Sequence, residues 1–154
     1  VSTFNALMSA ASGSSGTVTL CASSQITLGA QLVVNRSGAF TLQCATGGSC
    51  TINGNGRFAT TISASTVSIS GITFINGYSS NNGGAITISS TYSSTSQASR
   101  IQYCSFINNK AVMTGGAVYV NGFADIINCS GSNNQAAQCS AIYQSSAGTC
   151  TALY

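Results

Sequence analysis

Side chains that could carry out acid–base or nucleophilic chemistry are scarce in this sequence. Its 154 residues include one acidic residue, four basic residues and no histidine. General acid–base catalysis normally uses a histidine or a pair of carboxyl groups, and the single acidic residue, Asp125, provides neither. A Ser-His-Asp or Cys-His nucleophile also needs histidine and is therefore excluded. We expect a protein that is not an enzyme and that uses no cofactor.

The scarcity of charge also limits the ligands that the chain can bind. Calcium and magnesium sites use several carboxylates, so we expect no metal site. The net charge of +3 comes from four scattered cations, which is too few for a nucleic acid backbone. No run of about 18 apolar residues occurs, so we expect no membrane span. No signal peptide is visible, and we interpret Val1 as the start of a mature chain.

Seven cysteines predict an oxidising compartment, and hence an extracellular, secreted protein with disulfides. The alternative is a reduced protein with buried thiols. The sequons at Asn35 and Asn128 fit secretion and are candidates for glycosylation. Cys44 and Cys50 enclose the short loop ATGGS, and we predict that they form a disulfide.

An odd number of cysteines leaves at least one without a partner in the same chain. Cys139 replaces a corner glycine and Cys150 lies near the last residue, so both are candidates for a bond between molecules. The alternative is a buried, unreactive thiol.

The elements that would position these residues are short. Residues 3–11 place apolar side chains at helical spacing and predict a helix. The rest of the chain consists of apolar runs of about four to eight residues, separated by Gly, Asn and Ser. We therefore divide the chain into an N-terminal helical cap, residues 1–16, and a β-structure, residues 17–154.

One phrase occurs twice in that β-structure. ITFINGYSSNNGGAI begins at Ile72, and CSFINNKAVMTGGAV begins at Cys104. Shorter copies align at residues 49–55 (SCTINGN), 128–134 (NCSGSNN) and 149–154 (TCTALY). Several short strands in each repeat of 20 to 30-odd residues are typical of a β-solenoid. We predict a right-handed parallel β-helix of about five to six coils, and the alternative is a β-sandwich with coincidental repeats.

Alternation along the aligned strands assigns side chains to the inside or the outside. The inward columns are expected to be Cys50, Ile72, Cys104, Cys129 and Cys150; Ile52, Phe74, Phe106, Gly131 and Ala152; and Ile86, Val118 and Ile142. The outward rows are a hydroxyl row of Thr51, Thr73, Ser105, Ser130 and Thr151, and a second row of Thr87, Tyr119 and Tyr143. Stacked inward cysteines lie about 4.8 Å apart, which permits either a bridge or buried thiols.

Two further sets of residues are expected at the turns. Asn76, Asn108 and Asn133 are predicted to form a ladder of amides that hydrogen bond from turn to turn. The repeat corners, which need positive φ or a close backbone approach, are Gly83, Gly84, Gly115 and Gly116.

The corner phrases at residues 83–86 and 115–118, together with FINN at 106–109, resemble the GGA[ILV] and FxxN repeats of the chlamydial polymorphic outer-membrane proteins. More broadly, the chain resembles the pectin-lyase-like β-helices. The resemblance implies a right-handed parallel β-helix, an N-terminal helix over the first coil, and a role in adhesion. It carries over no catalytic residue, because the acidic and basic residues of the lyases and hydrolases have no match here.

We expect a non-catalytic structural or adhesive protein that assembles with copies of itself into an extracellular filament, wall or coat. TCTALY ends within a repeat and is expected to leave an open, uncharged edge to which another strand can bind. One alternative is an ice-binding protein that uses the hydroxyl row. Another is a β-helix that binds carbohydrate. The partner would be ice in the first case and a polysaccharide in the second.

Overall fold

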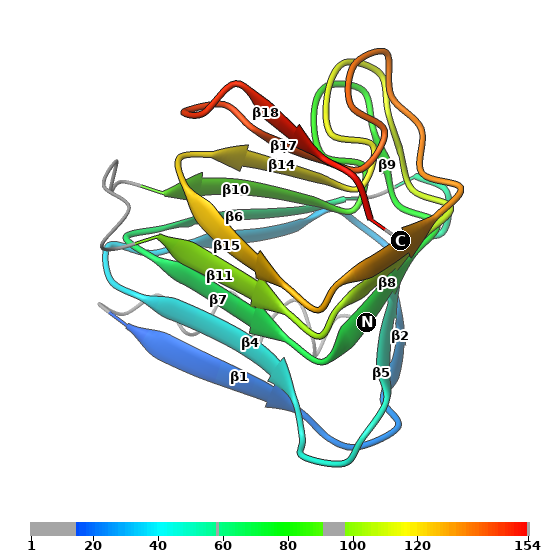
Figure 1. Ribbon diagram of the computed structural model, residues 1–154. Coiled ribbons are helices and arrows are strands. Elements are labelled where there is room, and N and C mark those ends of the chain that lie inside the picture. Colours follow the sequence, from blue (N-terminus) through cyan, green and yellow to red (C-terminus); the bar gives the residue numbers. More distant parts are fainter. Residues whose placement is uncertain (1–14, 58, 91–97, 154) are drawn as a thin grey trace.

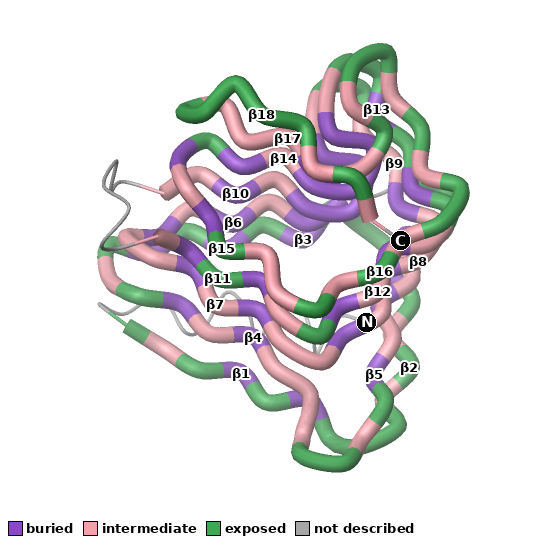
Figure 2. Tube along the Cα trace, in the orientation of Figure 1, coloured by how far each residue is buried: buried purple, intermediate pink, exposed green. Residues whose placement is uncertain are grey.

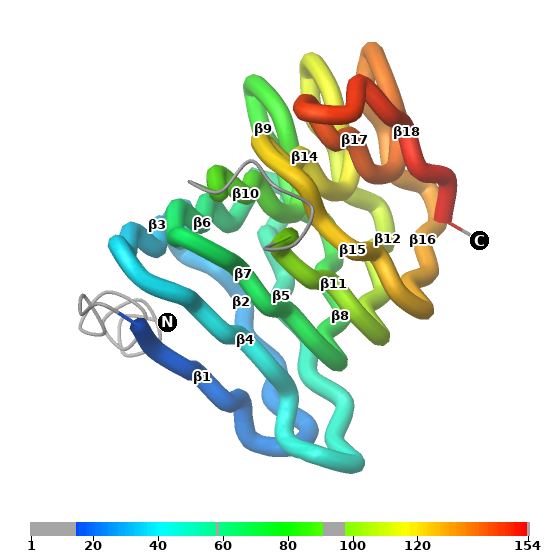
Figure 3. Tube along the Cα trace, turned by 60° about the vertical axis from the view of Figure 1, so that its left-hand side comes forward, coloured from blue at the N-terminus to red at the C-terminus, as the bar shows by residue number. Residues whose placement is uncertain are grey.

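A computed structural model of the chain describes residues 15–57, 59–90 and 98–153, and these form a parallel β-solenoid of about five turns (Figure 1). The predicted all-β solenoid is therefore confirmed. The described residues contain no helix, and the helix expected at residues 3–11 lies outside them. Each turn adds one strand to each of three sheets, as the oblique view in Figure 3 shows.

The three sheets are named here in the order in which the chain enters them. Sheet 1 contains β1 (Gly16–Leu20), β4 (Phe40–Cys44), β7 (Val67–Ser70), β11 (Ser99–Gln102) and β15 (Ala124–Ile127). Sheet 2 contains β2 (Gln25–Thr27), β5 (Cys50–Asn53), β8 (Ile72–Ile75), β12 (Ser105–Ile107) and β16 (Ser130–Ser132). Sheet 3 contains β3 (Leu32–Asn35), β6 (Thr60–Ala64), β10 (Ile86–Ser90), β14 (Val118–Asn121), β17 (Ile142–Gln144) and β18 (Thr149–Thr151). A two-stranded ladder joins β9 (Tyr78–Ser79) to β13 (Lys110–Ala111).

The core is built from columns of inward side chains, because each strand pairs in register with its copy in the next turn. Ile52 pairs with Phe74, and Phe74 pairs with Phe106, whose rings stack with centroids 5.5 Å apart. Figure 2 shows buried positions alternating with more accessible ones along the strands. The predicted column of Ile86, Val118 and Ile142 is also in register. Burial of each such side chain stabilises the fold by about 1.5–3 kcal/mol.

The columns of sheet 2 begin one turn earlier than the repeat alignment predicts. Ile26 of β2 pairs with Ile52 and packs against the core. The phrase QIT at residues 25–27 is alternating and short, but no Asn-Gly or Asn-Asn pair accompanies it, as one does in the copies at residues 49–55, 71–77, 103–109 and 128–134. The structure therefore shows a first turn of sheet 2 that the repeated sequence phrase does not reveal.

The last segment is not a fifth copy of the repeat, and this prediction was wrong. β18 runs antiparallel to β17, so that Cys150 lies beside Tyr143 and Thr151 beside Ile142. A tight turn at residues 145–148 reverses the chain, with the N–H of Gly148 bonded to the carbonyl of Ser145. Three residues consequently leave the columns and the row assigned to them: Cys150, Thr151 and Ala152.

The double glycine at the repeat corners meets two separate requirements. Gly83 and Gly115 have φ of +65° and +64°, a region that other residues enter at a steric cost. Gly84 is needed for space, because a Cβ there would meet the carbonyl oxygen of Gly116 in the next turn. In the third copy Cys139 takes the left-handed conformation, with φ of +55°. The predicted corners are therefore found where the repeat placed them.

Candidate functional site

The hydroxyl row on the outer side of sheet 2 is present, with one end different from the prediction. Thr51, Thr73, Ser105 and Ser130 follow one another in register, whereas Thr151 belongs to sheet 3. Gln25 precedes the row, because it pairs with Thr51. The Ser130 hydroxyl donates to that of Ser105 at 3.2 Å. Next to this row runs a mixed one of Thr27, Asn53, Ile75, Ile107 and Ser132.

The outer side of sheet 3 carries the second predicted row. Thr87, Tyr119 and Tyr143 are in register, and the two tyrosine rings stack with centroids 5.9 Å apart. The row continues into the earlier turns through Thr61 and Val33. Val33 is 53% exposed, so the row changes along the solenoid axis from aliphatic through hydroxyl to aromatic.

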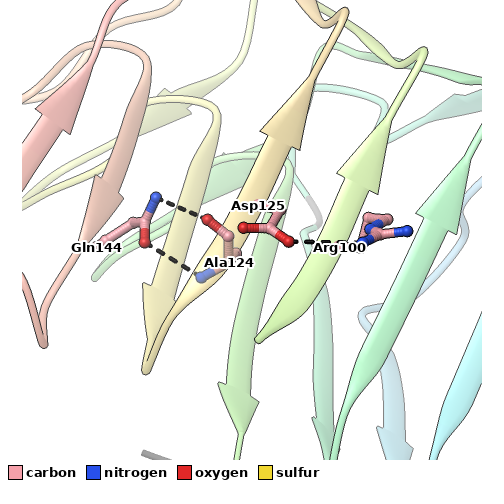
Figure 4. A network of polar contacts seen from close by, with 4 residues as sticks. All are labelled: Arg100, Ala124, Asp125 and Gln144. Carbon is pink, nitrogen blue, oxygen red and sulfur yellow. Dashed lines mark hydrogen bonds and ion pairs between the residues drawn. The ribbon is translucent and has the colours of Figure 1, made fainter. Parts of the chain in front are cut away.

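The outer side of sheet 1 holds two polar rows that the sequence reasoning missed. The first is Thr17, Thr41, Ser68, Arg100 and Asp125; the second is Thr19, Gln43, Ser70, Gln102 and Ile127. The alternation in TVT and SIS was the available signal, but no repeated phrase marked it. In the last two turns Arg100 lies 3.6 Å from Asp125, and both side chains are about half exposed (Figure 4). This pair is the only ion pair among the described residues, so the three outer sides are otherwise nearly uncharged.

The amide ladder runs through a different position from the one predicted. Asn76, Asn108 and Asn133 have φ of +53° to +56°, and the latter two are exposed. Asn76 bonds to Asn53 at 3.4 Å, but the interior ladder uses the next residue, Asn109. A left-handed residue interrupts the alternation of the strand, which turns the following side chain inward.

Asn109 is fully buried, and its side-chain amide has partners on both sides. Its Nδ2 donates to the Phe74 carbonyl at 3.1 Å and to Oδ1 of Asn134 at 3.0 Å. Its Oδ1 accepts the N–H of Gly77 at 2.8 Å. Asn134 repeats the pattern by donating to the Phe106 carbonyl at 2.9 Å. Gly77 replaces asparagine in its own turn because a Cβ there would collide with the carbonyl of Gly84.

The cysteines form two disulfides. The predicted Cys44–Cys50 bridge is present, with Cα atoms 5.7 Å apart. Cys139 bonds to Cys150, with Cα atoms 5.5 Å apart, so the proposal that these two are available to other molecules was wrong. The disulfide holds β18 against β17 and supports the antiparallel hairpin. The cysteines outside disulfides are Cys21, Cys104 and Cys129.

Cys104 and Cys129 are neighbours in one inward column and remain thiols. Cys104 is buried, whereas Cys129 is half-buried in the last rung of sheet 2. The hydrogen bond from the Cys104 thiol lowers the pKa of Cys129 to about 7, against the opposing effect of burial. The hydrogen bond to Cys129, together with burial, raises the pKa of Cys104 far above its usual range.

The last turn is closed by side chains from within the chain. Gln144 lies in the inward column after Val120 and reaches across to sheet 1. Its Oε1 accepts the N–H of Ala124 at 3.1 Å, and its Nε2 donates to the carbonyl of the same residue at 3.0 Å (Figure 4). Leu153 packs against the core over Gly131, where the missing side chain leaves room. These contacts cover part of the last turn, and the parallel edge expected at TCTALY was wrong, because that segment runs antiparallel to β17.

The described part of the chain has no group of three or more His, Cys, Asp or Glu residues placed to hold a metal ion. None of its segments is a helix long and apolar enough to cross a membrane. Asn35 and Asn128, the glycosylation candidates, are both exposed.

Comparison of the chain with protein-family models, with curated proteins and with solved structures gives no match. The resemblance to the polymorphic outer-membrane proteins consequently depends on the repeat phrases alone.

Replacing Asn109 with alanine is expected to lower the free energy of unfolding by about 3 kcal/mol. The substitution leaves the buried N–H of Gly77 without its acceptor, which costs about 1–3 kcal/mol, and it also removes the bonds from the amide to Phe74 and Asn134. Urea unfolding measures the change. The matched control is Asn108→Gly, next in sequence but exposed, which should cost under about 1 kcal/mol. Equal stabilities of the two variants would contradict a stabilising ladder.

Cys129 should react with iodoacetamide in the folded protein with a midpoint near pH 7, because the thiolate is the nucleophile and its pKa is about 7. Cys104 should be labelled only after denaturation. The measurement is mass-spectrometric peptide mapping in a Cys21→Ser background, which removes the exposed thiol. Cys104→Ala should move the midpoint upward, since it deletes the hydrogen bond that lowers the Cys129 pKa. An unchanged midpoint would show that this bond does not control the pKa.

Proposed function

We propose that the chain is a non-catalytic, secreted structural or adhesive β-solenoid that associates side by side with copies of itself in an extracellular assembly. The observation that carries the proposal is the character of the three outer sides. Each is a regular array of hydroxyl, amide and apolar side chains in register, with a single ion pair among the described residues.

Such surfaces are suited to lateral packing for two physical reasons. Removing charged groups from water is costly, and these surfaces present almost none. A net charge of only +3, carried by few groups, also leaves little repulsion between copies. The backbone positions are already fixed by the sheets, so little conformational entropy is lost on association.

The structure of the last turn favours sideways association over stacking end to end. Stacking through that end would use the edges of sheets 1 and 2, and on sheet 1 Gln144 already bonds to both backbone groups of Ala124. On sheet 3, β18 lies antiparallel at the edge and breaks the parallel register. Covering an edge is one way in which native sheets avoid pairing with another strand.

Secretion and adhesion are supported by independent features. Two disulfides favour an oxidising compartment, and the exposed sequons at Asn35 and Asn128 are accessible to a glycosyltransferase. The likeness of the GGA corners to those of polymorphic outer-membrane adhesins supports a role in adhesion.

Ice binding is a second candidate, favoured by the first three turns of sheet 1. There the two outward rows hold only hydroxyl and amide side chains: Thr17, Thr41 and Ser68 in one, Thr19, Gln43 and Ser70 in the other. This surface is more regular than the predicted row on sheet 2, which is flanked by isoleucines.

Sedimentation velocity over a range of concentrations should show association of the unmodified protein, and negative-stain images should show particles joined along their sides. Paired lysines on the associating side should weaken it at least about tenfold by like-charge repulsion. The variants are Thr41→Lys with Ser68→Lys on sheet 1, Thr73→Lys with Ser105→Lys on sheet 2, and Thr61→Lys with Thr87→Lys on sheet 3. Each pair serves as the control for the others. A monomer at every concentration, or association that survives all three pairs, would refute lateral packing.

If the chain binds ice, the unmodified protein at micromolar concentration should produce thermal hysteresis and faceted ice crystals. The Thr41→Lys, Ser68→Lys variant should abolish both, since it places two hydrated charges on the flat rows of sheet 1. The sheet 2 pair is the control and should retain activity. Absence of thermal hysteresis in the unmodified protein removes this candidate.

A further inference from the structure

The positive charges of this chain are distributed unevenly over its surface. Asp125 is the only acidic residue in the sequence, and it is paired with Arg100. Arg36 is 6% exposed and lies over the Phe40 ring at 5.0 Å, away from solvent. The two remaining cations, Arg57 and Lys110, are exposed, and the sequence has no second acidic residue to pair with them.

Both cations lie in connections from sheet 2 to sheet 3: Arg57 between β5 and β6, and Lys110 in β13, between β12 and β14. The connection that contains β9 projects from the solenoid together with those of the later turns (Figure 1). Lys110 pairs directly with Tyr78 of the preceding turn in the β9–β13 ladder. The N–H of Gly56, next to Arg57, bonds to the carbonyl of Asn76 at 2.6 Å. Arg57, Tyr78 and Lys110 thus come from three consecutive turns, with the aromatic residue in the middle.

A polar cleft of about 330 Å³ opens at this place. Its walls include Gln31, Arg57, Tyr78, Ser79, Ser80 and Asn81. The volume lies at the small end of the range for ligand sites, about 300–1,000 Å³, and is suited to one small molecule or one unit of a polymer. Lys110 is one rung beyond the walls and adds to the positive potential.

The polar groups of the cleft are placed to bind hydroxyl groups as well as an anion. Gln31 donates its Nε2 to the Thr61 hydroxyl at 3.0 Å, which leaves its carbonyl oxygen as an acceptor. The Ser79 hydroxyl accepts the N–H of Asn81 at 3.2 Å and keeps its own proton to donate. A guanidinium binds a carboxylate or sulfate through two parallel hydrogen bonds, and an aromatic ring offers an apolar surface beside it.

We propose that this cleft binds a small hydroxylated anion, a sugar unit bearing a carboxylate or a sulfate group, with Arg57 on the anionic group and Gln31 and Ser79 on its hydroxyls. The site adjoins the outer side of sheet 3 at one point, the hydrogen bond from Gln31 to Thr61, and uses no residue of the outer sides of sheets 1 and 2. The bound unit is either a free molecule or part of a longer chain, and both present the same chemistry.

Isothermal titration of the disulfide-intact protein at low salt tests the site with four probes: glucuronate, glucose 6-sulfate, neutral glucose and inorganic sulfate. The two sugar anions should bind, more weakly as salt is added, and glucose and sulfate should bind at least about tenfold less well. Arg57→Gln should weaken sugar-anion binding at least about tenfold, and Lys110→Gln by a smaller factor. The matched control, Arg100→Gln, removes an equal charge from sheet 1 and should have little effect.

Equal binding of glucose and glucuronate, or an Arg57→Gln variant that binds as well as the unmodified protein, would overturn the proposal. Inorganic sulfate that binds as tightly as glucose 6-sulfate would also overturn it, because the hydroxyl contacts would then contribute nothing. A uronate or sulfated oligosaccharide that binds more tightly than its single unit supports the site and identifies a polymer as the source. Sedimentation velocity of the Arg57→Gln variant distinguishes ligand binding from lateral assembly. The variant should associate as the unmodified protein does, because Arg57 is not on the outer side of a sheet.

Discussion

Every turn of this solenoid lies in register on the next, and most features of the sequence follow from that one constraint. Strands in neighbouring turns are about 4.8 Å apart, so a residue at a given position always meets its counterpart. An inward phenylalanine must pack on an apolar side chain of the neighbouring turn, as Phe74 does on Ile52 and Phe106, or face a position that leaves room, as Phe106 faces Gly131. A buried amide must find its partner one turn away, as Asn109 does in Asn134. A residue that packs well on, or hydrogen bonds to, the same residue in the next turn can be used in every turn. This is why a phrase is repeated along the chain.

The same constraint explains why charge is scarce. A charged side chain repeated in register would place like charges directly opposite one another, which destabilises a sheet. The few charges that remain avoid this arrangement. Arg100 lies between Ser68 and Asp125, and Lys110 pairs with Tyr78 on one side and bridges to Gln135 on the other. Uncharged outer sides are therefore a consequence of the architecture as well as a property that favours packing between copies.

The sequence predicts the interior of this fold better than its ends. Periods of two and of 20-odd residues assign the inward columns correctly from Cys50 to Cys129, because burial and register both act on each position. TCTALY satisfies the same pattern locally, yet a hairpin turn and the bond from Cys139 to Cys150 place it antiparallel in another sheet. The asparagine ladder was displaced by one residue, because only the backbone shows that Asn108 is left-handed and that Asn109 points inward. The rows of sheet 1 carry no repeated phrase and were missed for that reason.

The surface offers two kinds of binding site. The outer rows of the sheets follow the repeat, whereas the cleft beside Tyr78 does not. The outer rows have a regular spacing, and some keep one kind of side chain over several turns, as the hydroxyl row of sheet 2 does. A periodic surface complements a periodic partner, such as another solenoid or a crystal lattice. The cleft beside Tyr78 is built from side chains that are not repeated from turn to turn, since the counterparts of Lys110 are Tyr78 and Gln135. A unique site can select one chemical group, whereas a repeated side adds weak contacts over many turns. The core fixes the backbone of the outer rows and of the cleft. Side chains at either place can therefore change without altering the inward columns, so that self-association and ligand binding can be varied independently.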